Sequence, residues 1–469
     1  MRNEIVYFLN SSFIIFVLIF IMTVPHGFLD PFNTEQQLTL VLLIVAVYLW
    51  TISTLPKGAA SILILVLMII LNLVGSVEEA VIGFLSPALY FIFILTTISK
   101  VLIKVGLDKE VSLLLLKLSK SGSKVITLIL PFTMLFLPLI LPSAFARFKM
   151  LFPLIEKLNE SFGFKEKSFF KKYSLYVIGI MNQNATIVVY TGGGFPILAA
   201  QLLSDYNIAN LSWTEWFFLM APPLWIGLFV VNIFTYQFLK NNNSADERQL
   251  PKSLSSELET RETRDHTNRS LSFWFVVFTF SIMIIVWMVT DQTVIPILVP
   301  PMILLVIYSI PKIGLITDRD IKNFDWENFL LLGSSFSIGA LIEKNGTAQL
   351  IAENLMNLIP ENSTTMIQVI FIAIIIFLFR LIFVVPSSAI IVIFPIIISY
   401  SEVTNLSALS LAFLIILVIG GTNIFPIHAP PSYFAYQTGV LTRSEHYTIA
   451  TTSTIILVTT AILASIFWW

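Results

Sequence analysis

Hydrophobic residues fill long, nearly uninterrupted stretches of the chain, and short polar loops separate them. Most of these stretches are about 20 residues long, which is the length of an α-helix that crosses a bilayer. The short alternating segments that are typical of a membrane β-barrel are absent from the sequence. The pattern predicts an all-α polytopic membrane protein with about eleven spans, at residues 11–28, 38–55, 58–74, 84–104, 174–203, 215–239, 271–290, 294–310, 327–344, 407–439 and 447–469.

Two further apolar stretches, residues 125–157 and 365–400, are interrupted near the middle. The first contains "LPSAFARFKMLFP", which begins at Leu141, and the second contains "VVPSSAIIVIFP", which begins at Val384. In each, a proline precedes a small hydroxyl residue, and a second proline follows. Proline lacks a backbone donor and disfavours helix in the residue before it, so each stretch is predicted to break. We expect two re-entrant hairpins, each entering and leaving the membrane on one side.

Loop charges are consistent with this topology. If the N-terminus is cytoplasmic and both hairpins are re-entrant, the outer loops carry Asp and Glu but neither Lys nor Arg. Lys and Arg prefer short cytoplasmic loops, so the pattern predicts a cytoplasmic N-terminus and an external C-terminus. These outer loops are residues 29–37, 75–83, 204–214, 291–293, 359–364 and 401–406.

The two halves of the chain carry similar features in the same order. "ISKVLIKVGLDKEVSLLLLKL" aligns without a gap on "IGALIEKNGTAQLIAENLMNL", with Gly106 on Gly346. A hairpin follows each, and then a span interrupted by glycine, "NQNATIVVYTGGGFP" or "GGTNIFPIHAPP". Because the hairpins open to opposite sides, this order predicts an inverted repeat, which is typical of secondary transporters. The alternative is chance, because Gly and Pro are common in membrane helices.

The repeat predicts five segments. Residues 1–124 would form N-terminal scaffold helices, and residues 125–239 the first hairpin, its interrupted span and the next helix. Residues 240–270 are polar and mixed in charge, which predicts a cytoplasmic linker. Residues 271–364 would form the scaffold helices of the second repeat. Residues 365–469 would form the second hairpin, its interrupted span and the last helix.

A helix that starts at a hairpin tip presents unpaired N–H groups and a positive dipole end, both of which favour an anion. An arginine at membrane depth costs at least about 3 kcal/mol on insertion scales, so a function is expected of it. The alternatives are that the serines only cap helices and that the arginines pair with Glu156, Glu343 or carbonyl groups. The candidate substrate-binding residues are Ser143, Ala144, Arg147, Arg380, Ser387 and Ser388.

The glycine-rich interruptions expose carbonyl groups next to Asn and Thr side chains. Such oxygen atoms suit a hard monovalent cation. The alternative is that the glycines only allow helices to pack closely. The candidate ion-binding residues are Asn182, Asn184, Thr186, Thr191, Gly192, Gly421, Thr422 and Asn423.

Composition narrows the class of protein. Charged residues make up 12% of the chain, against about 25% in soluble domains. The net charge of −1 gives no reason to expect a nucleic acid as partner. Without cysteine there is no thiol chemistry, and the sequence has no zinc-protease, hydrolase or phosphate-loop motif. We therefore expect no catalytic residues, no bound metal and no cofactor beyond a coupling ion.

The stretch "ENFLLLGSSFSIGALIEKNGTAQLIAENL", the proline-containing hairpin tips and the interrupted spans resemble the divalent anion:sodium symporters of the ion-transporter superfamily. That family carries Ser-Asn-Thr at both tips, where it contacts sodium and substrate. Here the tips read Pro142-Ser143-Ala144 and Pro386-Ser387-Ser388. The resemblance implies a homodimer in which the hairpins and interrupted spans move as an elevator against a scaffold.

These observations together predict a secondary active transporter of a small anion, such as a di- or tricarboxylate or sulfate, coupled to Na⁺ or H⁺. It would lie in a cell inner or plasma membrane, with lipid and a second copy of the chain as partners. The alternatives are a cation/proton exchanger or another carrier with this architecture, an integral membrane enzyme, and a channel or sensor.

Overall fold

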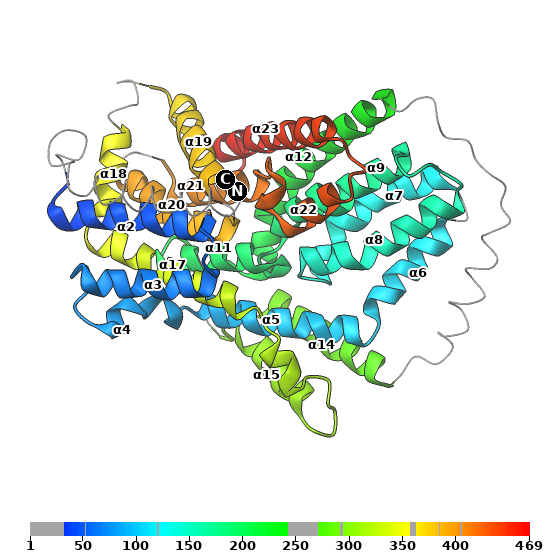
Figure 1. Ribbon diagram of the computed structural model, residues 1–469, viewed down its shortest axis with the longest axis horizontal. Helices are drawn as coiled ribbons and strands as arrows, with labels where there is room; N and C mark the ends of the chain where they lie inside the picture. Colours follow the sequence, from blue (N-terminus) through cyan, green and yellow to red (C-terminus); the bar gives the residue numbers. More distant parts are fainter. Residues whose placement is uncertain are drawn as a thin grey trace, which may run out of the picture. The chain divides into compact units, whose positions relative to one another are not determined.

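A computed structural model describes residues 32–51, 53–119, 122–242, 271–290, 294–356, 363–383, 385–403 and 406–469. The predicted span at 11–28 and nearly all of the predicted linker lie outside these ranges. Within them every regular element is a helix (Figure 1). The chain divides into two compact units, Met1–Tyr90 with Asp325–Ile415 and Phe91–Phe324 with Ile416–Trp469.

The first unit is organised around α17 (Trp326–Lys344), which packs against α3 (Lys57–Ile70) and the 3₁₀ helix η1 (Ile82–Leu85). Gly83 permits this packing, because a Cβ there would lie 2.3 Å from the carbonyl oxygen of Gly333. The other helices of this unit are α2 (Thr34–Thr51), α4 (Val77–Ala80), α18 (Thr347–Met356), α19 (Thr365–Ile382), α20 (Pro386–Val403) and most of α21 (Ala408–Gly421).

The second unit contains most of α5 (Pro87–Lys104) and the long helix α12 (Trp213–Asn242), which packs along α23 (Arg443–Phe467). Its first broken stretch consists of α7 (Ser123–Phe136), η2 (Leu137–Leu139) and α8 (Ala144–Ser161). Apart from the interrupted span at 174–203, the other helices of this unit are α6 (Leu107–Ser119), α14 (Leu271–Val289), α15 (Val299–Ser309), α16 (Asp318–Lys322), η7 (Pro426–His428) and α22 (Pro430–Gln437).

The predicted span at 174–203 is a series of short helices rather than one. It runs through α9 (Phe169–Tyr176), a π-helical turn (η3, Val177–Met181), α10 (Asn182–Ala185), η4 (Thr186–Val188), η5 (Tyr190–Gly192) and α11 (Gly194–Asp205). The predicted span at 407–439 is interrupted between α21 and α22. Both interruptions fall at the glycine- and proline-rich sequences that predicted them.

The two aligned amphipathic stretches have the same local geometry. Gly106 and Gly346 both take a positive φ, +94° and +73°, between two helices. Glycine adopts this conformation at little steric cost, and it is common just after a helix ends. In the second unit α6 packs on α8, and in the first unit α18 packs on α20. Each amphipathic helix therefore lies against the second limb of the broken stretch that follows it.

Five helices of the described residues are long and apolar enough to cross a bilayer, namely α5, α12, α14, α19 and α23. Large apolar side chains on all five are exposed, including Phe218, Phe278 and Leu378 at 66%, 66% and 54%. Water would disfavour so much apolar surface, whereas lipid would not. Helix α19 meets the length criterion, although we predicted it to be one limb of a hairpin.

We predict that Gly83→Ala destabilises the protein by about 2 kcal/mol, because the new methyl group would overlap backbone atoms of α17. The measurement is the melting temperature of the purified protein in detergent. Gly75→Ala is the control, since a Cβ at position 75 would meet only Glu79, at 3.7 Å. Equal melting temperatures for the two variants would contradict the packing described.

Candidate functional site

The first break lies between η2 and α8, at Pro142 and Ser143. Ser143 is the N-cap of α8, and its hydroxyl accepts a hydrogen bond from the backbone N–H of Ala146 at 3.2 Å. Ala144 is the first helical residue, and its carbonyl oxygen accepts a hydrogen bond from the Asn182 amide at 2.8 Å. Two of the candidate residues, Ser143 and Ala144, therefore hold the break in shape and join it to the interrupted span.

Arg147 lies one turn into α8 and is fully buried. Its Nε donates to the Asn182 side-chain oxygen at 2.7 Å, and one terminal nitrogen donates to the carbonyl of Leu141. The other terminal nitrogen donates to the Thr186 hydroxyl at 2.9 Å and to the Asn182 carbonyl at 3.3 Å. Among the described residues no carboxylate forms an ion pair with it. The guanidinium is held entirely by neutral oxygen atoms.

The interrupted span is shaped by glycine at one point of close approach. A Cβ on Gly192 would lie 2.2 Å from the carbonyl oxygen of Thr186, so only glycine fits there. The hydroxyl of neighbouring Thr191 accepts a hydrogen bond from the indole N–H of Trp213 at 3.0 Å. Thr191 thus anchors the span to α12. The predicted ion-binding residues of this span therefore do not form one cluster.

A second polar group joins the two interrupted spans inside the second unit. The Asn423 side-chain amide donates to the Asn184 side-chain oxygen at 2.5 Å and to the Gly420 carbonyl at 3.0 Å. The Asn184 amide donates to the hydroxyl of Ser453 on α23 at 3.4 Å. All three polar side chains are buried, and the side-chain oxygen of Asn423 has no hydrogen-bond partner among the described residues.

Two other predicted ion-binding residues near this group have local contacts. The hydroxyl of Thr422 donates to the carbonyl of Val418 at 2.7 Å, within its own helix. A Cβ on Gly421 would lie 3.0 Å from the Cβ of Leu457, so this glycine allows α21 to approach α23 closely. Neither contact adds an oxygen atom to the cluster of Asn184, Asn423 and Ser453.

The second break lies in the other unit, between α19 and α20. Arg380, near the end of α19, is fully buried and donates to the carbonyl oxygen of Phe383. Pro386 begins α20, so Ser387 and Ser388 lie in its first turn. Both serines are buried, and within the part of the chain that the structure describes the hydroxyl of Ser388 has no hydrogen-bond partner. This break therefore offers an unengaged polar group at a helix N-terminus.

The comparison with protein families gives a match over nearly the whole chain. The model described as "Sodium:sulfate symporter transmembrane region" matches residues 5–469. The chain belongs to the sodium:sulfate symporter family. Membership of this family makes it a membrane transporter. This agrees with the long apolar helices and with the resemblance noted in the sequence.

The chain is similar in sequence to bacterial proteins. It is 29% identical over 192 residues to a putative malate transporter, YflS, of Bacillus subtilis, and this region is 39% of each chain. It is 22% identical over 472 aligned positions to an uncharacterized transporter of Haemophilus influenzae, covering 95% of this chain and 92% of the relative.

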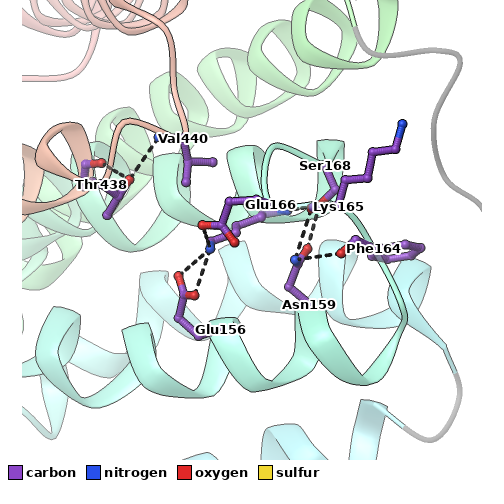
Figure 2. A network of polar contacts seen from close by, with 10 residues as sticks. Glu156, Asn159, Phe164, Lys165, Glu166, Ser168, Thr438 and Val440 are labelled. Carbon is purple, nitrogen blue, oxygen red and sulfur yellow. Dashed lines mark hydrogen bonds and ion pairs between the residues drawn. The ribbon is translucent and has the colours of Figure 1, made fainter.

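A charged cluster joins the C-terminal part of α8 to α9, where the interrupted span of the protein begins. Glu156 lies 2.8 Å from the Lys171 ammonium, and Glu166 also pairs with it (Figure 2). Burial alone would lower the pKa of Lys171, but its bonds to the two carboxylates outweigh burial and raise it. Glu156 is thus engaged by Lys171, and it is not the partner of Arg147 that we considered.

Further polar contacts strengthen the same end of the second unit. The Ser168 hydroxyl donates to the side-chain oxygen of Asn159 at 2.6 Å, and the Asn159 amide donates to the carbonyl of Lys165 at 3.2 Å (Figure 2). Lys172 forms a buried ion pair of 2.7 Å with Glu445 of α23. These contacts hold the C-terminal end of α8 against the start of α9, and α9 against α23.

Sequence reasoning missed Ser453 and the carbonyl of Leu141. The signal for Ser453 was available, because "TTST" within the last apolar span places small polar residues at membrane depth. A backbone carbonyl leaves no signal in the sequence. The contact of Leu141 with Arg147 follows from the path of the break.

We predict that Asn182→Ala destabilises the symporter by about 2–3 kcal/mol, because the buried guanidinium loses a hydrogen-bond acceptor. Thermal unfolding of the purified protein measures the effect. Gln183→Ala is the matched control, since its side chain lies on the same short helix and is only partly buried. If both variants melt at the same temperature, Asn182 does not support Arg147.

Proposed function

We propose that this symporter-family protein is a secondary active transporter of a small anion, of the di- or tricarboxylate or sulfate class. The observation that carries the proposal is the fully buried arginine at each break. Arg147 and Arg380 each lie close to a helix N-terminus, so positive charge and positive dipole ends coincide. A site with this electrostatic character favours an anion. The name of the Bacillus subtilis relative, a putative malate transporter, agrees with a carboxylate.

The two breaks would attract an anion in different ways. At the first break the N–H groups of Arg147 donate to protein oxygen atoms, so its contribution is its charge and the N-terminus of α8. At the second break the Ser388 hydroxyl has no partner in the described ranges, so it could donate to an anion. Ser387 lies beside it in the same first turn. We assign direct contact with the anion to the N-terminus of α20, and electrostatic attraction at each break to the arginine of that break.

The coupling ion in this proposal is Na⁺ or H⁺. Its candidate site is the cluster of polar side chains formed by Asn184, Asn423 and Ser453. Amide and hydroxyl oxygen atoms are suitable ligands for a monovalent cation, and Asn423 has one oxygen with no partner. The proposed mechanism is an elevator, in a homodimer, in which the hairpins and interrupted spans carry the anion. The similar geometry at Gly106 and Gly346 supports the repeat on which this mechanism rests.

The alternative carrier, a cation/proton exchanger, is less well supported by the buried groups. Such an exchanger needs a titratable ligand that alternates between a proton and a metal cation. Among the buried residues of the described ranges, Glu445 is the only acidic one, and it pairs with Lys172. The buried charges at the breaks are positive, which favours an anionic solute.

Uptake into liposomes tests the proposal. Purified protein should accumulate labelled malate, succinate, citrate or sulfate when an inward Na⁺ or H⁺ gradient is imposed. Liposomes without protein, and proteoliposomes whose gradients have been abolished by ionophores, are the controls. If none of these anions is taken up under either gradient or by exchange with internal anion, the proposed function is wrong.

We predict that Ser388→Ala raises the KM for the transported anion about fivefold, since a neutral hydrogen bond contributes about 1 kcal/mol. The melting temperature should stay within error of wild type, because the Ser388 hydroxyl makes no hydrogen bond to any described residue. Ser335→Ala is the control, as its hydroxyl donates to the Leu331 carbonyl at 2.8 Å within α17. An unchanged KM for Ser388→Ala would exclude this hydroxyl from the site.

A further inference from the structure

Four oxygen atoms converge on the Arg147 guanidinium from two separate segments. The Leu141 carbonyl comes from the first break, and the other three come from the interrupted span. These three are the side-chain and main-chain oxygens of Asn182 and the hydroxyl of Thr186, at 2.7, 3.3 and 2.9 Å from their respective donor nitrogens. The side chain at their centre is fully buried.

These oxygen atoms are held in place by contacts that do not involve Arg147. The Asn182 amide donates to the carbonyls of Ala144 and Ile178, at 2.8 and 2.9 Å, so its oxygen is turned toward the guanidinium. The Thr186 hydroxyl donates to the Asn182 carbonyl at 3.1 Å, so its lone pairs remain to accept. The oxygen set is thus organised by the backbone around it.

The chemistry of the set is that of a site for a hard monovalent cation. Carbonyl, amide and hydroxyl oxygen atoms are the ligands by which unwound membrane helices bind such ions. The set carries no negative charge of its own, and the nearby acid on the same helix, Glu156, is engaged by Lys171. One positive charge, supplied by the chain itself, already lies at the centre.

We propose that Leu141, Asn182 and Thr186 form a monovalent-cation site that the Arg147 guanidinium fills permanently. The chain supplies by covalent attachment the cation that the oxygen atoms are arranged to bind. No free ion binds at this break, and any coupling cation binds elsewhere in the protein. Removing the side chain empties the site and makes it available to Na⁺. This proposal concerns ion binding and stability, so it stands or fails independently of transport.

The test is the thermal stability of Arg147→Ala in sodium chloride compared with choline chloride at equal ionic strength. We expect a saturable, Na⁺-dependent rise in melting temperature that exceeds the wild-type response by about 3 °C or more, because a ligand that binds only the folded state stabilises it. Potassium and lithium chloride establish whether the new site selects by ion size. Wild type measures any contribution of Na⁺ sites elsewhere.

Two further variants identify the site. Arg147→Lys keeps a cation on the chain, so its response to Na⁺ should match wild type. Arg147→Ala combined with Thr186→Val removes one oxygen ligand at nearly constant volume, so the gained response should shrink by at least half. An alanine variant that gains no response to any of the three cations overturns the proposal. An alanine variant that does not fold even in sodium chloride also overturns it, because Na⁺ then fails to replace the guanidinium.

Discussion

A guanidinium buried without a carboxylate must be stabilised by dipoles, and this constraint organises the centre of the second unit. Burying a charge is costly unless it is hydrogen-bonded. Here the chain provides the bonds by breaking two helices: the first break exposes the Leu141 carbonyl, and the interrupted span provides Asn182 and Thr186. Proline, glycine and the arginine are therefore parts of one arrangement. The breaks provide acceptors for the charge, and the charge holds the two broken segments together.

The two polar groups of the second unit have opposite electrostatic character. Around Arg147, oxygen atoms surround a positive charge. Around Asn423, an amide oxygen has no donor and the neighbouring groups are neutral. The short α10 helix separates them, because Asn182 belongs to the first group and Asn184 to the second.

Much of the architecture could be predicted from the sequence, because apolar length, proline and glycine act locally. The helix breaks at Pro142 and Pro386 and the positive φ at Gly106 and Gly346 are examples. The contacts of the arginines could not be predicted, since the acceptors of Arg147 include carbonyl groups, which every residue has. Glu156 shows the same limit: the sequence offered it as a carboxylate partner for Arg147, but the fold brings Lys171 to it.

The π-helical turn from Val177 to Met181 directly precedes α10 and sets the direction in which the side chains of α10 point. Residues two apart on a helix point about 200° apart, so Asn182 and Asn184 face opposite sides of α10. A π turn holds one more residue than an α turn, and such turns are frequent at functional sites. Tightening this turn to α geometry would rotate both asparagines together by about 100°. Without the extra residue of the π turn, neither Asn182 nor Asn184 would be in register with its present partner, Arg147 or Asn423.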